Sequence, residues 1–461
     1  MRIELPENVE CILNRLIENG YEAYIVGGCV RDSILGKAPQ DFDITTNAKP
    51  AAVKELFKRT IDTGILHGTV TVMIENQGYE VTTYRIDGEY EDNRRPKSVE
   101  FTSDLMEDLR RRDFTINAMA YNREEGLIDS FQGLNDLKKG IIRSVGDADS
   151  RFQEDALRIL RGVRFSAQLD FEIEDETKEA MKRNSPLLKN ISAERIRVEL
   201  DKLLVSDNPD KLVDAYYLGI TNIIFPEFDY MMETDQNNPH HIYNVGIHSL
   251  KAAEYVKRDD LLRKEPDETT DEKEKYFHCL RWGMLLHDVG KPVTKTTGED
   301  GYDHFYGHPA KGAIIGKEIL QRLKFDNDTI DVVTKLIKWH EDDFSMTPQS
   351  IRRQMNKMGT VITKLYFQMK KADIMAQSPD TRKEKLQKLE LSHKIYEEVV
   401  EKGECVNLKM LAVNGRDLIG LGYKPGITLG HTLNYLLQEV IKDPSLNEKK
   451  ALLTLAKDLK L

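Results

Sequence analysis

Two aspartates separated by one residue form the first group whose type and spacing could support chemistry. Asp41 and Asp43 lie in a segment, residues 41–45, that is predicted to be a strand, and the two-residue period of a strand places both carboxylates on one face. Like charges this close repel each other unless a cation lies between them, and a carboxylate pair together with substrate phosphates commonly holds Mg²⁺. The pair is therefore a candidate Mg²⁺ site, although an isolated Asp-x-Asp is more often an ordinary polar strand end.

A glycine pair just before this strand is a candidate phosphate-binding turn. Gly27 and Gly28 follow a strand predicted over residues 22–26 and precede a short helix predicted over residues 30–35, which carries Arg31. Glycine lets the backbone approach a phosphate closely, the start of a helix offers free N–H groups, and a guanidinium adds a planar set of donors. Together with the aspartate pair, this unit supplies the phosphate donors and metal ligands that nucleotidyl transfer needs.

Further polar residues extend this candidate site. Glu80, in a hairpin strand predicted over residues 79–84, is a candidate third carboxylate. Arg112, at the end of an arginine run, is a candidate ligand of a triphosphate, and Asn117 is a candidate donor to ribose or phosphate. A solvated surface position is the alternative interpretation of the carboxylate and of the arginine run.

A helix predicted over residues 154–168 carries an aspartate and an arginine that could recognise a nucleobase. Asp155 and Arg158 are three residues apart and therefore neighbours on one face, and Arg161 continues the same stripe towards the expected phosphates. A carboxylate can accept from an exocyclic amine while a guanidinium donates to a ring nitrogen or carbonyl, which fits cytosine and adenine but not uracil or guanine. The alternative is an ordinary helix ion pair worth roughly a few tenths of a kcal/mol.

Four motifs, in this order, resemble those of the class II tRNA nucleotidyltransferases, the family of the CCA-adding enzymes and bacterial poly(A) polymerases. They cover about the first 205 residues. The motifs are GGCVRD at 27–32 followed by DFD at 41–43, RRDFTINA at 111–118, EDALR at 154–158, and AERIRVE at 193–199. The resemblance implies a polymerase-beta-like head with two Mg²⁺ ions on the aspartate pair, triphosphate held by Gly28, Arg31 and Arg112, and base selection by Asp155 and Arg158.

The activity implied by this resemblance is template-independent addition of C, C and A to the 3′ end of tRNA from CTP and ATP. A charged loop over residues 85–97 resembles the flexible loop that accompanies addition of the terminal A. Addition of A alone and a poly(A) polymerase using only ATP are alternatives within the family. An alternative of another class is a metal phosphohydrolase whose head only binds RNA.

Histidine clustering marks a second candidate site. Eight of the eleven histidines lie between residues 240 and 340, and metal binding is the usual reason for such clustering. Six residues follow one another in the order H…HD…H…H…D, namely His248, His287, Asp288, His308, His340 and Asp373. This pattern resembles that of the HD phosphohydrolase superfamily. Imidazole with carboxylate suits Mn, Fe, Ni, Co or Mg, and such a site activates water for phosphoester hydrolysis. By resemblance, phosphomonoesters or 2′,3′-cyclic phosphates at RNA ends are candidate substrates, and His240, His241 and His304 fall outside the pattern.

The whole chain is expected to be an α+β protein. A small α/β head with a mostly antiparallel or mixed sheet (1–145) is followed by an all-α neck that binds the nucleotide base and RNA (146–225), an HD-type helical domain (226–385) and a C-terminal helical tRNA-binding region (386–461). A net charge of −11 excludes a uniformly basic surface but not a local basic track for tRNA. Scattered cysteines, no apolar run long enough for a membrane span and no signal peptide indicate a cytoplasmic protein. The oligomeric state is left open.

Overall fold

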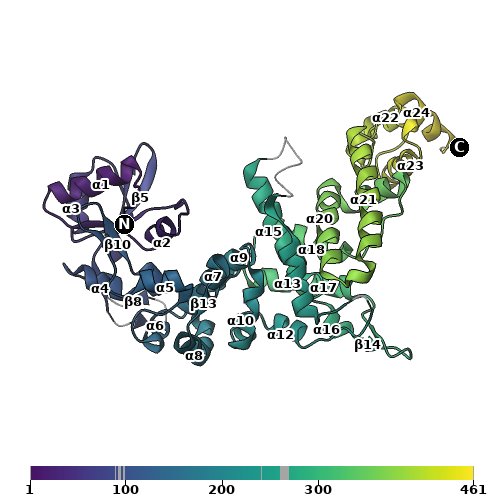
Figure 1. Ribbon diagram of the computed structural model, residues 1–461. Coiled ribbons are helices and arrows are strands. Elements are labelled where there is room, and N and C mark those ends of the chain that lie inside the picture. Colours follow the sequence, from purple (N-terminus) through teal and green to yellow (C-terminus); the bar gives the residue numbers. More distant parts are fainter. Residues whose placement is uncertain are drawn as a thin grey trace. The chain divides into compact units, whose positions relative to one another are not determined.

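The computed structural model describes residues 2–88, 90–91, 95–96, 99–239, 241–259 and 269–459. Its internal contacts divide the chain into two compact units, Met1–Asp229 (unit 1) and Tyr230–Leu461 (unit 2), and each is described by itself. In Figure 1, unit 1 runs from purple through blue to teal and contains all strands of the large sheet, whereas unit 2 runs from teal to yellow and is mostly helical. The expected fold class, a mixed α/β head followed by a helical body, is confirmed.

A mixed seven-stranded sheet, in the order β11-β10-β1-β2-β5-β4-β3, is the framework of unit 1. β2 pairs with β5 in parallel, and the other neighbours are antiparallel. β4 and β5 form the predicted hairpin, with Glu75 and Asn76 both at positive φ in its turn, as a tight two-residue hairpin turn requires. The strands are β1 (Ala23–Val26), β2 (Asp43–Thr46), β3 (Thr60–Gly64), β4 (Thr69–Ile74), β5 (Gln77–Thr83), β10 (Ala120–Asn122) and β11 (Gly126–Ile128).

Helices cover this sheet and continue beyond it in unit 1. Their apolar residues recur every three or four positions and are buried, as in α1, where Val9, Ile12, Leu13 and Leu16 face the core. The helices are α1 (Glu7–Glu18), α2 (Gly28–Ile34), α3 (Pro50–Leu56), α4 (Leu105–Arg110), α5 (Gly133–Lys139), α6 (Ala148–Glu154), α7 (Leu157–Leu169), α8 (Asp175–Asn184), α9 (Ala193–Leu204), α10 (Leu212–Tyr217) and α11 (Thr221–Ile224). A further helix, α12 (Pro226–Met232), begins in unit 1 and ends in unit 2.

Two predicted elements of unit 1 differ from the structure. The strand predicted over residues 41–45 begins only at Asp43, so Asp41 lies just before it. The single helix predicted over 154–168 is instead two helices, because Asp155 adopts an extended backbone conformation between α6 and α7 and its side chain accepts from the N–H of Leu157. Of the charged loop 85–97, β6 (Arg85–Asp87) pairs with β9 (Val99–Phe101), while residues 89, 92–94 and 97 lie outside the described residues.

Unit 2 is built from helices that pack side by side. Its longer helices are α13 (Val245–Tyr255), α15 (Thr270–Leu286), α17 (His308–Arg322), α18 (Asn327–Trp339), α19 (Pro348–Met358), α20 (Thr360–Ala376), α21 (Pro379–Glu401), α23 (Ile427–Lys442) and α24 (Lys449–Asp458), with the short α16 (Lys291–Thr294) and α22 (Gly415–Gly420) between them. The sequence predicts a helical region over residues 348–400, and the structure has α19 to α21 there, which contact one another.

One loop prediction in unit 2 is partly wrong. Residues 258–275 are rich in charge and carry no Val or Ile, a composition that predicts an exposed loop. Their last residues instead begin α15, where Thr269 and Glu272 form a reciprocal N-terminal cap. Residues 260–268 lie outside the described residues, as does His240. No helix within the described part of the chain combines the length and apolar character needed to cross a membrane.

Candidate active site and candidate metal centre

Three carboxylates meet at one end of the central strands of unit 1. In the parallel β2–β5 pair, Ile44 lies opposite Val81, so that Asp43 and Glu80, one residue earlier in each strand, are neighbours on the same face. Surrounding protein atoms and the charge of Asp41 raise the pKa of Asp43, against an opposing effect of Arg112. Partial desolvation and the charges of Asp43 and Asp41 raise the pKa of Glu80. Mutually repelling carboxylates of this kind fit a divalent cation.

Arg112 lies between the glycine turn and these carboxylates. Gly27 has φ +78°, and a Cβ built on it would lie 3.1 Å from Nη1 of Arg112. A side chain at residue 27 would therefore be strained and would also displace the guanidinium. The other side of the guanidinium faces the buried Asp108, whose Oδ2 lies 3.5 Å from Nη2 and also accepts from Oγ1 of Thr45 on β2. These contacts anchor Arg112 to the sheet beside the aspartate pair.

Arg31 and Asn117 bind each other. Nη1 of Arg31 donates to Oδ1 of Asn117 at 2.7 Å, and its Nε donates to Asp32 at 2.8 Å. Asn117, at the end of a 3-10 turn rather than on an α-helix, donates to Oδ1 of Asp113 at 3.2 Å. Both side chains are buried, so a direct contact of either with phosphate stays a prediction.

Asp155 and Arg158 do not form the helix ion pair that their spacing suggested. Asp155 accepts from Nη2 and Nη1 of Arg195 on α9, at 2.8 and 3.4 Å. Arg158 donates to Glu154 at 2.7 Å and to the carbonyl oxygen of Arg111 at 2.8 Å. The interpretation as i,i+3 neighbours on one helix is wrong because the chain breaks between α6 and α7 at Asp155.

Arg161 is held by an acid of the RRD motif. Its Nε donates to Oδ2 of Asp113 at 2.7 Å. Burial alone would raise the pKa of Asp113, but Arg161 and the hydrogen bond from Asn117 outweigh burial and hold that pKa far below its usual value. Arg195 and Asp113 were not among the predicted site residues, although both lie within the quoted motifs, which was the only signal available for them.

The six residues of the HD pattern meet in the interior of unit 2. Oδ1 of Asp288 lies 3.2 Å from Nε2 of His308 and 3.6 Å from Nε2 of His340. Oδ2 of Asp288 lies 3.2 Å from Nε2 of His287 and 3.7 Å from Nε2 of His248. Asp373 completes the group, with Oδ1 3.1 Å from Nε2 of His248. Within the described residues, two sets of ligand atoms lie close enough to hold a metal ion, and Asp288 belongs to both.

The orientation of the imidazoles fits metal ligation. The Nδ1 atoms of His287, His308 and His340 each lie 2.7 to 2.8 Å from a backbone carbonyl oxygen three residues earlier. Donating the Nδ1 proton there leaves Nε2 as the free ligand atom, the arrangement commonly found around bound metals. Nε2 of His287 faces Oδ2 of Asp288 at 3.2 Å in the buried interior, so that both candidate ligand atoms are directed into the cluster.

Two residues outside the predicted set also adjoin this cluster. Nζ of Lys291 lies 2.7 Å from Oδ2 of Asp288 and donates to Gln236 at 2.7 Å. Burial alone would raise the pKa of Asp288, but His287 and Lys291 outweigh it and hold that pKa well below its usual value. The ring of His241, set aside as incidental, lies 4.8 Å from that of His248, and burial and the charge of Lys291 lower its pKa to about 2. Only its place among the clustered histidines hinted at this position.

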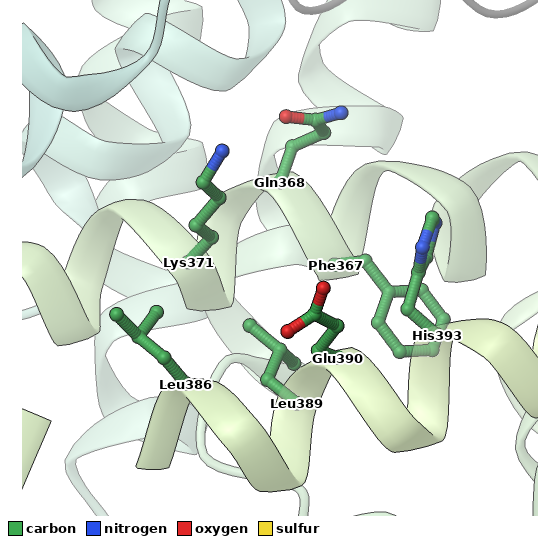
Figure 2. Close-up of a pocket in the computed structure, with 7 residues that line it drawn as sticks. All are labelled: Phe367, Gln368, Lys371, Leu386, Leu389, Glu390 and His393. Atoms are coloured by element: carbon green, nitrogen blue, oxygen red, sulfur yellow. The ribbon is translucent and has the colours of Figure 1, made fainter. Parts of the chain in front are cut away.

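A pocket elsewhere in unit 2 contains none of the predicted site residues. Figure 2 shows it between α20 and α21, with Leu386, Leu389, Glu390 and His393 projecting from one helix and Phe367, Gln368 and Lys371 from the other. This hollow is therefore not where the chemistry-bearing side chains meet, and the candidate sites are defined by converging ligand atoms instead.

Three family models match separate parts of this chain. Residues 23–143 match the family model "Poly A polymerase head domain", residues 170–232 match "Probable RNA and SrmB-binding site of polymerase A", and residues 315–456 match "tRNA nucleotidyltransferase domain 2". The CCA-adding enzyme of Lactiplantibacillus plantarum is 54% identical over 198 residues, 43% of this chain and 49% of that protein. That of Pediococcus pentosaceus is 45% identical over 255 residues, 53% of this chain and 64% of that protein.

The chain thus spans about half the length of the curated relatives it matches most strongly. Among solved structures, the Bacillus stearothermophilus CCA-adding enzyme in complex with CTP superposes with a TM-score of 0.71 at 27% identity, covering 99% of this chain and 98% of that one. The Thermotoga maritima CCA-adding enzyme complexed with tRNA has the same fold, with a TM-score of 0.60 at 20% identity and full coverage of both chains. This chain therefore belongs to the class II tRNA nucleotidyltransferase family of CCA-adding enzymes and bacterial poly(A) polymerases.

Proposed function

We propose that this protein adds C, C and A to the 3′ end of tRNA, using CTP and ATP and no nucleic-acid template. The observation that carries the proposal is the meeting of Asp41, Asp43 and Glu80 beside the Gly27 turn, with Arg112 between turn and carboxylates. This arrangement places candidate cation ligands next to candidate triphosphate ligands. The relatives named CCA-adding enzymes support the same activity.

Each group of the head has a role in this reaction. Asp41 and Asp43 would hold Mg²⁺, which when bound lowers the pKa of the attacking 3′-hydroxyl and stabilises the leaving pyrophosphate. Arg112 and the backbone at Gly28 would orient the triphosphate, and Glu80 would add negative charge beside the cation. Arg31 would fix the position of α2 through its hydrogen bond to Asn117. A direct contact of Arg31 with the triphosphate is the alternative.

Base selection is assigned to Asp155 and Arg158. The carboxylate of Asp155 would accept from the exocyclic amine of cytosine or adenine, and Arg158 would donate to the neighbouring acceptor. Both side chains are held within the protein, by Arg195 and by Glu154 respectively, so the incoming base would compete with or add to these bonds. Arg161 and Asn117 would support the phosphate end through Asp113.

The decisive experiment is product length on tRNA that ends at the discriminator base. CTP alone is expected to give two added residues, and CTP with ATP three. Incorporation of A directly after the discriminator with no use of CTP would indicate a poly(A) polymerase, and extension only of tRNA already ending in CC would indicate A addition alone. Asp41→Asn and Asp43→Asn should each abolish incorporation, and intact incorporation in either variant would contradict the proposal.

A second function is proposed for unit 2, as a metal-dependent phosphohydrolase. It is supported by the two ligand sets that share Asp288 and by the three imidazoles whose Nδ1 atoms face backbone carbonyl oxygens, which directs Nε2 towards the cluster. A cation would be held by Asp288 with His248 and His287, or by Asp288 with His308 and His340. Asp373 lies beside the first set, 3.1 Å from Nε2 of His248. A bound cation of the Mn, Fe, Ni, Co or Mg group would supply an activated water for phosphoester hydrolysis.

Metal analysis and hydrolysis assays test this second function. Purified protein should contain bound metal that Asp288→Asn loses, and the wild type should hydrolyse phosphomonoesters or 2′,3′-cyclic nucleotides with added Mn²⁺, Ni²⁺ or Co²⁺. Metal binding without hydrolysis of any of these substrates would show that the metal has a structural role and would contradict the phosphohydrolase activity. Retained hydrolysis in Asp288→Asn would place the activity elsewhere.

The remaining proposals concern organisation and setting. We infer a four-part division into head (1–145), neck (146–225), HD-type domain (226–385) and C-terminal tRNA-binding region (386–461), within the two compact units. tRNA is proposed as the macromolecular partner and the cytoplasm as the location. The absence of a membrane-crossing helix among the described residues is consistent with that location.

A further inference from the structure

The aromatic ring of Phe165 lies at the centre of a cluster of charged side chains in unit 1. Phe165 is on α7, is 5% exposed, and packs edge-on against Phe114, with ring centroids 5.9 Å apart. Three guanidinium groups surround the ring. Their central carbon atoms lie 4.0 Å (Arg164), 5.1 Å (Arg31) and 5.3 Å (Arg161) from its centroid.

Each of these arginines has a carboxylate of its own. The three pairs are Arg31 with Asp32 at 2.8 Å, Arg161 with Asp113 at 2.6 Å, and Arg164 with Glu199 at 2.6 Å. The centroid of the Phe165 ring thus lies within 5.3 Å of the central carbon atom of each of these paired guanidinium groups. Because each carboxylate comes from a different element, the ring joins α2, the RRD segment and α9.

The ring of Phe165 attracts these arginines electrostatically in addition to filling the space between them. Like charges around one point repel, and burial together with the charge of Arg161 lowers the pKa of Arg164 although Glu199 opposes this. The face of an aromatic ring carries negative potential and attracts cations within about 6 Å. An aliphatic side chain of similar size would fill the space without that attraction.

The three arginine–carboxylate pairs connect the ring of Phe165 to residues at both ends of the proposed nucleotide site. Arg31 fixes α2, directly after Gly27 and Gly28, and Asp113 directly follows Arg112. On α9, Glu199 lies one helical turn after Arg195, whose guanidinium holds the base-selecting Asp155. A shift of the ring would therefore displace residues at the phosphate-binding end and at the base-binding end together.

We propose that Phe165 is a positioning residue for nucleotidyl transfer, whose ring face fixes three arginine–carboxylate pairs and thereby aligns the phosphate-binding turn with the base-selecting Asp155. The inference rests on the nucleotidyltransferase function proposed above. It requires that the electrostatic character of the ring, and not only its shape, affects the rate of incorporation and the choice of base.

The test is a series of fluorinated phenylalanines at residue 165 of the full chain, introduced by codon suppression. 4-Fluoro-, 3,5-difluoro- and 3,4,5-trifluorophenylalanine keep the shape of the ring while progressively weakening its attraction for cations. We expect kcat for CTP and ATP to fall stepwise, by about 10-fold over the series. UTP incorporation relative to CTP should rise in parallel.

Phe152 is the matched control. It is a fully buried phenylalanine on α6 of the same unit, and among the described residues no arginine lies over its ring. The same fluorinated series there should change kcat by less than about twofold. Phe165→Leu should lower kcat more than Phe152→Leu does at equal loss of melting temperature.

Equal kcat and equal UTP discrimination across the series at residue 165, in a wild type that adds CTP and ATP, would overturn the role of Phe165 alone. Parallel losses at residues 165 and 152 would also overturn it, because they would show a packing effect. A wild type that incorporates neither CTP nor ATP would overturn the proposed function, and this inference with it.

Discussion

The carboxylate of Asp155 binds Arg195, forty residues later in the chain, and not Arg158, three residues later. The two bonds from the Arg195 guanidinium, at 2.8 and 3.4 Å, fix the plane of the carboxylate. Bidentate contacts of this kind give geometric precision as well as binding energy. The helix α9 thus orients the acid that we assign to base selection.

Arg195→Ala should therefore weaken base selection without removing a proposed nucleotide ligand. We expect kcat/KM for CTP and ATP to fall about 10-fold or more, because Asp155 would sample other rotamers, and relative incorporation of UTP to increase. Steady-state kinetics with each nucleotide measure both effects. Lys202→Ala, on an exposed position of the same helix, is the control and should behave as wild type. Unchanged discrimination in Arg195→Ala would argue against a role of Asp155 in base choice.

The pH dependence of incorporation should report the carboxylate cluster of the head. Desolvation and mutual repulsion raise the pKa values of Asp43 and Glu80, and only the ionised forms attract a cation. At low Mg²⁺ concentration, activity should thus fall as the pH decreases through these raised pKa values. Glu80→Gln removes one of the two carboxyl groups whose pKa is raised and should move the acidic limb of the profile to lower pH.

The comparison needs kcat/KM measured from about pH 5 to 8 for both proteins. Glu55→Gln, an exposed glutamate of α3, should leave the profile unchanged. An acidic limb at the same pH in wild type and Glu80→Gln would show that Glu80 does not interact with the cation-binding carboxylates.

Metal removal should destabilise unit 2. If the cluster around Asp288 binds a cation only in the folded state, a metal concentration of about 100 times Kd adds about 2.7 kcal/mol to the free energy of unfolding. Chelation should lower the melting temperature by several degrees, and Mn²⁺ should restore it. Asp288→Asn should lose this response, whereas His304→Gln, which changes a histidine outside the ligand sets, should keep it. A melting temperature insensitive to chelation in metal-loaded wild type would contradict the metal centre.

Acid stability should depend on Asp113. Arg161 and Asn117 hold its pKa below the value in the unfolded chain. A carboxyl of this kind contributes stability that is fully present above the unfolded pKa of about 3.9 and is lost as the pH falls towards the lower folded pKa. Asp113→Asn should cost about 2 kcal/mol at neutral pH, a figure reduced because Arg161 is partly exposed.

This cost should shrink in denaturant unfolding experiments as the pH is lowered below about 4, since the wild type then loses the same interaction. Asp175→Asn, at the N-terminus of α8, is a control on a helix outside this network and should show a small effect at every pH. A constant difference between wild type and Asp113→Asn down to acid denaturation would contradict the low pKa.

The sequence by itself determined the elements and the residue types at both sites. Alternating β-branched residues predicted the hairpin of β4 and β5, because side-chain periodicity is a local property of the backbone. The same kind of pattern predicted helix over 154–168, although not the break at Asp155. The motif order indicated the family, and the spacing of His248, His287, Asp288, His308, His340 and Asp373 selected the side chains that the fold gathers in unit 2.

Only the tertiary structure decided which charges pair. Asp155 had an arginine at the right helical spacing, yet the break between α6 and α7 turns it towards Arg195, and Asp113 takes Arg161. Lys291 and His241 join the metal-ligand cluster through packing alone. Several arginines lie near each of these acids in the sequence, so the sequence alone does not determine the ion pairs. Long-range packing determines them, because a buried charge is stable only where a partner and its hydrogen bonds are already in place.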